Sequence, residues 1–382
     1  MKRYLERWAW LLLAITLGAH GAMAAEAGVT DREIVVGQSL ALTGPLAELA
    51  PDIVNGTQAY FDGVNANGGI HGRRVRMVTR DDGYVAANTV KVVGQMIDED
   101  KVFALMNMTG TSNVAAVLPL LEKEKPPVPL IAPFTGAALI REPAINHVFN
   151  IRASYADETE KLVQHLTTIG VGRISVLWIN NGFGKDGLDG VHKAMAKRGL
   201  KVYSSAPIEP DASDTDKAVA ALHDTRPEVI IMITTGRATV DFIKAYNKVR
   251  KGMRFYTLSV MGTQATLRAL GADGVGVVVT SVVPFPWSYG NPAAREYRAA
   301  MQKSGFHNIS FLGFEAYLNA RVFAEGLRRA GRELTRTRFI AALEDMKRVD
   351  LGGFEVGFGK NTRQGSRHVE LVIIGAGQKF TR

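Results

Sequence analysis

The chain has 382 residues, a formal net charge of +9 and no cysteine. Without cysteine it can form no disulfide bond and has no thiol to carry a lipid. At about 150 residues per domain, this length predicts two domains that each bury a core. The lysine and arginine residues are scattered and are not interleaved with aromatic residues, so we interpret them as surface charge and expect no nucleic-acid partner.

The N-terminal segment has the pattern of a secretory signal peptide. Three basic residues within the first seven positions precede an apolar run from Ala9 to Ala19, and the small-residue triplet Ala22-Met23-Ala24 follows. The apolar run has 11 residues, whereas a membrane-spanning helix needs about 20. We therefore expect residues 1–24 to be cleaved on export, which leaves a freely diffusing periplasmic protein without a stable membrane anchor.

Short β-branched runs then alternate with longer amphipathic stretches, a pattern typical of parallel strands joined by crossover helices. The predicted fold class is therefore α/β. The predicted strands are Ile34–Leu40, Val75–Arg80, Phe103–Met106, Val128–Ile131, His147–Phe149, Ile174–Ile179, Lys201–Ser205, Val229–Thr234, Phe255–Leu258 and Val277–Val282. The helices predicted between them are Asp52–Asn67, Ala86–Asp98, Asn113–Glu124, Glu158–Ile169, Lys185–Arg198, Asp216–Asp224 and Val240–Val249.

The alternation stops beyond Val283, at the segment Pro284-Phe285-Pro286-Trp287. Helices are then predicted at Ala293–Lys303, Leu312–Ala330 and Arg338–Met346, with extended segments at Phe354–Phe358 and His368–Ile374. Such a tail lets the chain cross between two lobes more than once, which makes a hinge that bends while the lobes stay together. We expect two Rossmann-like lobes with parallel sheets. Lobe I comprises residues 25–150 plus 284–350, and lobe II comprises 151–283 plus 351–382.

The loops that follow the strands are the candidate binding site, because open parallel sheets bind ligands outside the carboxyl ends of their strands. Three of these loops, 39–45, 107–113 and 132–137, combine hydroxyl side chains and glycine near the start of a helix. Free N–H groups and the positive end of a helix dipole favour a carboxylate there. Alternatively, the threonine and serine side chains only cap helices. The convergence of three such loops on one face favours binding.

Several segments carry a family resemblance. They are Ile34–Pro45, Gly56–Arg73, Arg80–Asp82, Gly110–Glu122, Val128–Ala138 and Gly313–Gly331, and the run from the Asn-Ala-Asn-Gly-Gly turn to the Asp81-Asp82 pair is the most specific. Over nearly the whole mature chain, the sequence resembles the leucine/isoleucine/valine-binding protein family, the periplasmic receptors of ABC importers for branched-chain amino acids and related acids. The resemblance implies a monomeric type I periplasmic binding protein that closes on a small-molecule ligand, docks on a membrane permease and catalyses nothing.

The resemblance also implies ligand contacts on both sides of a cleft. In lobe I these are Ser39, Thr43, Gly110, Thr111, Ser112, Phe134, Thr135 and Gly136. In lobe II they are Tyr155, Phe183, Thr235, Gly236, Met261 and Gly262. Family members that hold an amino acid usually place an acidic residue near the last two positions to meet the ammonium group, but the loop Ser259–Thr263 contains none. The ligand is therefore either an amino acid whose ammonium group is met elsewhere, or a related apolar or aromatic acid.

Other functions are weaker interpretations. Residues 182–187 read G-x-G-x-x-G between a predicted strand and helix, which formally matches a dinucleotide-binding fingerprint. An exported protein has little access to nicotinamide cofactors, so we expect no cofactor. The histidines are scattered and H-E-x-x-H is absent, so we expect neither an enzyme nor a metal site. The remaining alternative to import is a sensory receptor that passes its closed form to a signalling protein.

Overall fold

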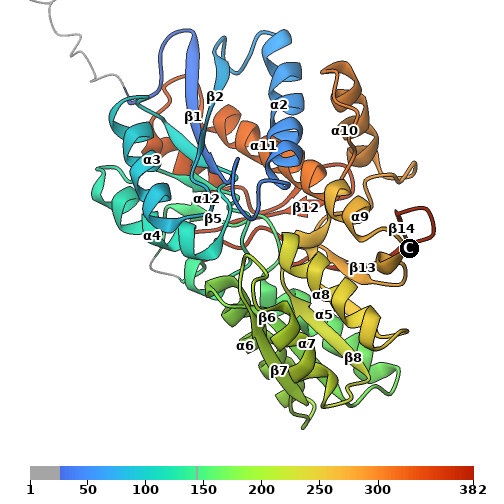
Figure 1. The fold of residues 1–382 in the computed structure, drawn as a ribbon. Coiled ribbons are helices and arrows are strands. Elements are labelled where there is room, and N and C mark those ends of the chain that lie inside the picture. The colour runs from blue at the N-terminus through green and yellow to red at the C-terminus, as the bar shows by residue number, and fades with distance from the viewer. Residues whose placement is uncertain (1–25, 143–144) are drawn as a thin grey trace, which may run out of the picture.

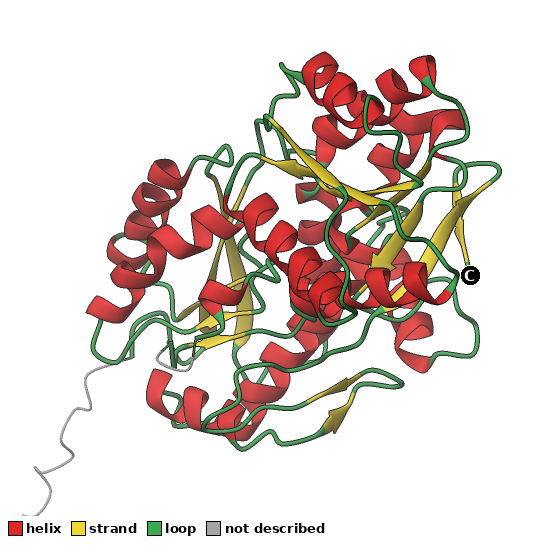
Figure 2. Cartoon of the chain, turned by 90° about the horizontal axis from the view of Figure 1, so that it is seen from below, coloured by secondary structure: helices red, strands yellow, loops and turns green. Residues whose placement is uncertain are grey.

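The structure is a computed structural model that describes residues 26–142 and 145–382. The expected signal peptide lies outside the described residues. Two main sheets with their helices form an upper and a lower lobe in Figure 1, and Figure 2 shows helices on both faces of the strands. The predicted α/β fold class is confirmed.

The upper lobe, lobe I, contains a parallel sheet with the strand order β2-β1-β3-β4-β5. Its strands are β1 (Glu33–Leu40), β2 (Arg74–Asp81), β3 (Ala104–Met106), β4 (Leu130–Ile131) and β5 (Val148–Phe149). The helices that connect them are α2 (Ala50–Ala66), α3 (Ala86–Asp98) and α4 (Thr111–Lys123), and a short 3-10 turn spans Ala138–Ile140. Because each helix returns the chain to the same end of the sheet, the loops after the strands gather at one edge.

Lobe II contains a mixed sheet with the order β14-β13-β10-β9-β8-β6-β7. Its strands are β6 (Ile174–Ile179), β7 (Ser204–Ile208), β8 (Val229–Ile233), β9 (Arg254–Thr257), β10 (Val278–Ser281), β13 (Glu370–Gly375) and β14 (Lys379–Thr381). The helices are α5 (Tyr155–Thr168), α6 (Gly182–Ala196), α7 (Thr215–His223), α8 (Gly236–Val249) and α9 (Gln264–Leu270), with 3-10 turns at Ser259–Met261 and Gly271–Gly274. The strands from β6 to β10 pair in parallel, whereas β13 and β14 are antiparallel additions at one edge.

The C-terminal helices return to lobe I. They are α10 (Pro292–Lys303), α11 (Phe311–Ala330) and α12 (Arg336–Glu344), followed by the hairpin of β11 (Val349–Asp350) and β12 (Glu355–Val356). Helices α10 and α11 pack on α2, as Figure 1 shows. Within the described residues, the chain therefore passes between the lobes three times: after β5, after β10 and before β13.

The first and third passages pair with each other. The backbone N–H of Asn150 donates to the carbonyl of Arg363 at 2.9 Å, and the rings of Phe149 and Phe358 lie 5.2 Å apart. Residues 358–365 therefore contact the end of the lobe I sheet at Phe149 and Asn150. The assignment of residues 351–382 to lobe II stays a prediction.

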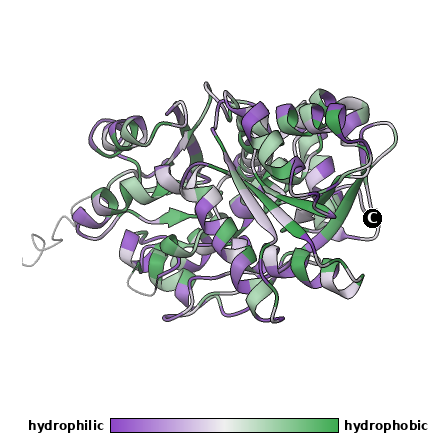
Figure 3. Ribbon diagram, turned by 60° about the horizontal axis from the view of Figure 1, so that its bottom comes forward, coloured by the Kyte–Doolittle hydropathy of each residue, from purple (hydrophilic) through white to green (hydrophobic). Residues whose placement is uncertain are grey.

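Helices α6 and α8 begin three and four residues before their predicted starts, and both begin at a glycine. Helix α6 starts at Gly182, so the G-x-G-x-x-G run forms its first turns rather than a loop. A Cβ atom at Gly184 would lie 1.9 Å from the carbonyl oxygen of Ile179, and one at Gly187 would lie 2.3 Å from the side chain of Ile233. These glycines thus let α6 pack closely on the sheet, which explains the motif without a dinucleotide. In Figure 3, green, which marks hydrophobic residues, is frequent on the strands that the helices cover.

The contact between α2 and α11 depends on a pair of glycines. A Cβ atom at Gly56 would lie 2.0 Å from the carbonyl oxygen of Gly313. The two helix backbones therefore meet where neither carries a side chain. This close approach positions the first turn of α11, including Leu312, against lobe I.

We predict that Gly56→Ala lowers the free energy of unfolding by about 1–3 kcal/mol, because the added methyl group overpacks the helix contact. Gly63→Ala on the same helix is the matched control, since a Cβ atom there meets nothing within 4 Å. The control should raise stability by about 0.5–1 kcal/mol through helix propensity. Denaturant unfolding measures both, and equal effects of the two variants would contradict the packing argument.

Candidate functional site

A cavity lies between the lobes, where the carboxyl ends of the strands in the two sheets face each other. It is lined by Leu46, Leu49, Ile53, Tyr84, Thr109, Gly110, Thr111, Phe134, Tyr155, Phe183, Thr235, Val260 and Leu312. None of these described lining residues carries a charge. The space open to water-sized molecules is about 20 Å³, which is room for about one water molecule. The cavity is therefore narrow and mainly apolar in this conformation.

The lobes contact each other directly around this cavity. Each of three hydrogen bonds joins a residue of lobe I to a residue of lobe II. The bonds run from Thr266 Oγ1 to Glu48 Oε1 at 2.9 Å, from the Ala138 backbone N–H to Asp186 Oδ2 at 2.8 Å and from Asn181 Nδ2 to Tyr84 Oη at 3.2 Å. The structure thus represents a closed form, in which protein–protein contacts shield the cavity.

Two helices start at the cavity from opposite lobes, and neither is capped by a side chain. The N-cap residue of α4 is Gly110, with φ of 91°, and that of α8 is Thr235. By contrast, Ser154 caps α5 and Asn181 caps α6. The first-turn N–H groups of α4 and α8 therefore lack a side-chain acceptor at the cavity, which is the arrangement that favours an anion. The alternative that hydroxyl groups only cap helices does not hold for α4.

Two hydroxyl groups in the cavity wall have no hydrogen-bond partner among the described residues. They belong to Thr109 in lobe I and Thr235 in lobe II, which are 4 % and 5 % exposed. A third hydroxyl, Thr111 Oγ1, lies 2.7 Å from Thr135 Oγ1 and is already paired. A buried polar group without a partner costs free energy, so the first two hydroxyls are the side-chain groups most ready to bind a ligand.

The structure brings together part of the predicted contact set. Gly110, Thr111, Phe134, Tyr155, Phe183 and Thr235 line the cavity. The hydroxyls of Ser39 and Thr43 instead donate to Asp82 Oδ2 at 2.7 Å and to Asp81 Oδ2 at 2.6 Å. They hold the loops of lobe I together and do not line the cavity.

The other predicted contacts also lie just outside the lining set. They are Ser112, Thr135, Gly136, Gly236, Met261 and Gly262. Ser112 is exposed, Thr135 pairs with Thr111, and the carbonyl of Gly136 accepts from the N–H of Tyr155 at 2.9 Å. All of these residues stay predictions as ligand contacts, since a ligand that opens the cavity further would approach them.

Seven lining residues were not among the predicted contacts: Leu46, Leu49, Ile53, Tyr84, Thr109, Val260 and Leu312. Thr109 lies in a loop that the sequence had singled out, and Val260 precedes a predicted contact. Leu46 and Leu49 precede α2, whereas Ile53 and Leu312 lie near the starts of α2 and α11. At all four positions an apolar residue has the same pattern as a core residue. No local signal distinguishes them, because their exposure to the cavity depends on how the two lobes meet.

A buried ion cluster lies behind the cavity wall and connects the lobes. Arg152, in the first passage between lobes, is 1 % exposed. Its Nε lies 3.5 Å from Glu315 Oε1 on α11, and its Nη2 lies 3.9 Å from Glu158 Oε1 on α5 and donates to Ser259 Oγ. The guanidinium is also 5.9 Å from the ring centre of Phe134, which lines the cavity. The cluster therefore links both lobes to one wall of the site.

Burial raises the pKa of Glu315 to about 7, an effect that the positive charge of Arg152 partly offsets and the negative charge of Glu158 increases. The folded protein thus binds the carboxyl proton of Glu315 more tightly than the unfolded chain does. The contribution to stability is full below the ordinary value of 4.5 and is lost as the pH rises through about 7.

We predict that Glu315→Gln removes this part of the pH dependence, so that the difference in unfolding free energy between wild type and variant changes between pH 4.5 and pH 8. The wild type should lose stability relative to the variant as the pH rises. Glu325→Gln, a partly exposed position on the same helix, serves as the control. Denaturant unfolding at several pH values measures the effect, and parallel wild-type and Glu315→Gln profiles would contradict the prediction.

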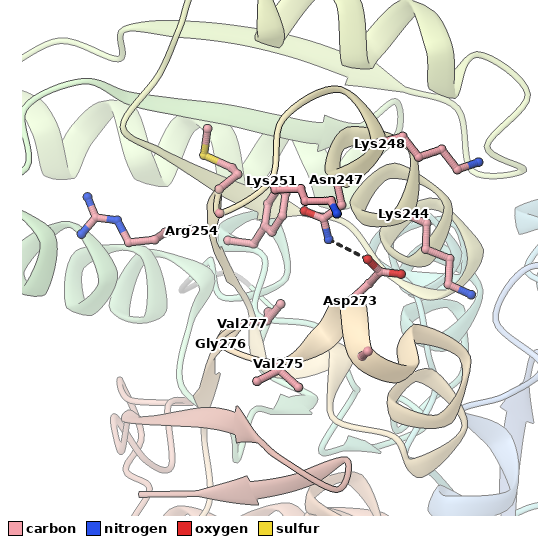
Figure 4. A pocket seen from close by; sticks show the side chains of 13 residues that line it. Lys244, Asn247, Lys248, Lys251, Arg254, Asp273, Val275, Gly276 and Val277 are labelled. Carbon is pink, nitrogen blue, oxygen red and sulfur yellow. Dashed lines mark hydrogen bonds between the residues drawn. The ribbon is translucent and has the colours of Figure 1, made fainter.

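A larger hollow on lobe II, of about 790 Å³, is a weaker candidate site (Figure 4). Four basic residues line it: Lys244, Lys248, Lys251 and Arg254. Figure 4 shows the side chains of Lys244 and Arg254 extending away from each other, so they do not converge on one point. Several of these lysines lie at or just beyond the C-terminal end of α8, where a positive charge is favoured by the helix dipole. The helix dipole explains the positions of these lysines without an anionic ligand.

The comparisons with known proteins agree with this geometry. Residues 33–379 match the model of a family described as periplasmic binding protein. The chain belongs to this family. Its members bind ligands and are not enzymes, as the sequence predicted. Among the described residues, no helix is long and apolar enough to cross a membrane.

Similar proteins support the same assignment. A substrate-binding periplasmic protein from Ralstonia solanacearum is 32% identical, with a TM-score of 0.83 over 90% of this chain and 98% of that chain. A possible leucine/isoleucine/valine-binding protein from Rhodopirellula baltica SH 1 is 29% identical, with a TM-score of 0.86 over 94% and 97%. The Leu/Ile/Val-binding protein homolog 3 of Brucella melitensis biotype 1 is 21% identical over 87% of this chain and 89% of its own length. The resemblance found in the sequence is confirmed.

Proposed function

We propose that the protein is the periplasmic solute-binding component of an ABC importer and captures a small carboxylate-bearing ligand between its lobes. The observation that carries this proposal is the pair of uncapped helix starts, Gly110 of α4 and Thr235 of α8, that face one closed cavity from opposite lobes. A carboxylate between them accepts N–H bonds from both lobes, and it therefore stabilises the closed form, which a permease recognises. The signal-peptide pattern and the names of the similar proteins support the periplasmic setting.

The composition of the cavity wall favours an acid with an apolar body over an α-amino acid. No charged side chain is among the described lining residues. Glu48, near Leu46 and Leu49 in the chain, accepts the hydroxyl of Thr266 and is not part of the lining. An ammonium group in this cavity would lose its hydration without meeting a negative charge, which costs several kcal/mol. Of the two ligand classes that the sequence left open, the structure therefore favours the apolar or aromatic acid.

The first prediction of this proposal compares two ligands that share a carbon skeleton. We expect 4-methylpentanoate to bind at least a hundredfold more tightly than leucine, which carries the same skeleton with an ammonium group; a hundredfold is about 2.7 kcal/mol. Isothermal titration calorimetry on the mature protein measures both affinities. The pair 3-phenylpropanoate and phenylalanine provides an independent replicate with an aromatic body. Tighter binding of the amino acid in both pairs would contradict the ligand class.

The second prediction concerns the unpaired hydroxyl of Thr235. Thr235→Val keeps the side-chain shape and should weaken acid binding about tenfold, because one hydrogen bond to the carboxylate is lost. It should leave thermal stability unchanged or slightly higher, since the hydroxyl has no partner in the protein. Thr257→Val is the matched control: its buried hydroxyl donates to the carbonyl of Met232 at 3.0 Å, so stability should fall and affinity should not. The reverse pattern would remove Thr235 from the site.

A further inference from the structure

Tyr84 occupies an unusual position in the loop between β2 and α3. Its φ is 62°, a left-handed conformation that bulky residues rarely adopt. The carboxylate of Asp82 holds this conformation, because its Oδ1 accepts from the N–H of Tyr84 at 2.9 Å. Its Oδ2 accepts from the hydroxyls of Ser39 on β1 at 2.7 Å and Thr89 on α3 at 3.1 Å. Two elements of lobe I thus fix the direction in which the tyrosine leaves the backbone.

The ring of Tyr84 packs directly on Gly110, the first residue of the carboxylate-binding helix start. A Cβ atom at Gly110 would lie 2.6 Å from Tyr84 Cε2, so the contact needs a glycine at this position. The ring is also part of the cavity wall. It therefore limits the space available to a ligand whose carboxylate binds at α4.

The hydroxyl of Tyr84 reaches the other lobe. Its oxygen accepts from Asn181 Nδ2 at 3.2 Å. The side-chain oxygen of Asn181 is engaged in lobe II, where it caps α6 by accepting from the N–H of Gly184 at 3.1 Å. Each end of the contact is thus held by its own lobe, and the bond between them breaks when the lobes separate.

We propose that Tyr84 is the gate of the ligand cavity. Its ring limits the size of the acid that fits between the lobes, and its bond to Asn181 slows the release of the ligand. This inference rests on the proposed function, and it adds a specificity-determining residue that contacts the ligand and a bond that controls how long the cavity stays closed.

The role of the Tyr84–Asn181 hydrogen bond is tested by measuring the dissociation rate of 4-methylpentanoate in stopped-flow fluorescence. Tyr84→Phe keeps the ring and removes the bond, so dissociation should become about fivefold faster, the effect of one hydrogen bond of about 1 kcal/mol. Asn181→Ser keeps a good cap for α6 but cannot reach the tyrosine, and it should give the same increase. The double variant should show no further increase, because both substitutions remove one bond.

The size limit is tested with Tyr84→Gly. Glycine adopts a φ near 60° without strain, so this variant should fold while the ring is removed. We expect the affinity for octanoate relative to 4-methylpentanoate to rise at least tenfold. Thr266→Val, which breaks the separate bond to Glu48 between the lobes, should speed dissociation and leave this ratio unchanged.

The outcomes separate the two proposals. If the wild type binds these acids, an unchanged dissociation rate in Tyr84→Phe or an unchanged size ratio in Tyr84→Gly overturns the gate while the proposed function stands. If the wild type binds none of the acids, the proposed function fails and the gate fails with it. Faster release in both single variants without an additive effect, together with the shifted ratio, supports the gate.

Discussion

The arrangement of the two lobes depends on the buried charge of Arg152. A guanidinium that is removed from water needs carboxylate partners, because an unpaired buried charge costs several kcal/mol. The neighbouring acidic residues are Glu158 from lobe II and Glu315 from lobe I, so this ion cluster is complete only where the first passage, α5 and α11 meet. The fold therefore has a buried ion cluster where the chain passes from one lobe to the other.

The candidate binding site lies beside this buried ion cluster. Phe134 lies against Arg152 on one side and lines the cavity on the other, so the cluster supports one wall of the site. The parallel strands bring the starts of α4 and α8 to the same cavity from opposite lobes. A ligand that bridges these helix starts favours the closed form through contacts that an open form lacks. Capture of a ligand thus needs no reacting group, in agreement with the family to which the chain belongs.

Much of the fold could be predicted from local patterns. The buried strand β6 and the amphipathic helix α3 have the bounds that the sequence indicated, because their periodicity is strong. The starts of α6 and α8 were missed, since glycine normally disfavours a helix interior. Here Gly184 is required by the close approach to the carbonyl oxygen of Ile179, which is a packing contact between α6 and β6 that no local pattern contains.

The site was predictable to a smaller extent, and the reason is physical. Loops after parallel strands lie at the end of the sheet where ligands bind, and this rule points to Gly110, Thr111 and Phe134, which line the cavity and stay predictions as ligand contacts. A hydroxyl that binds a neighbouring aspartate has the same sequence pattern as one that binds a ligand, so the role of Ser39 could not be resolved. Leu312 contributes to the cavity only because α11 returns to lobe I after two passages.

A crystal structure of the mature protein with bound 4-methylpentanoate tests the central claim most directly. The account predicts closed lobes, with the carboxylate within hydrogen-bond distance of the first-turn N–H groups of α4 and the hydroxyl of Thr235. The apolar body should lie against Phe134 and Leu312, and no acidic side chain should contact the ligand. A ligand held outside the interlobe cavity, or a carboxylate placed away from both helix starts, would contradict the account.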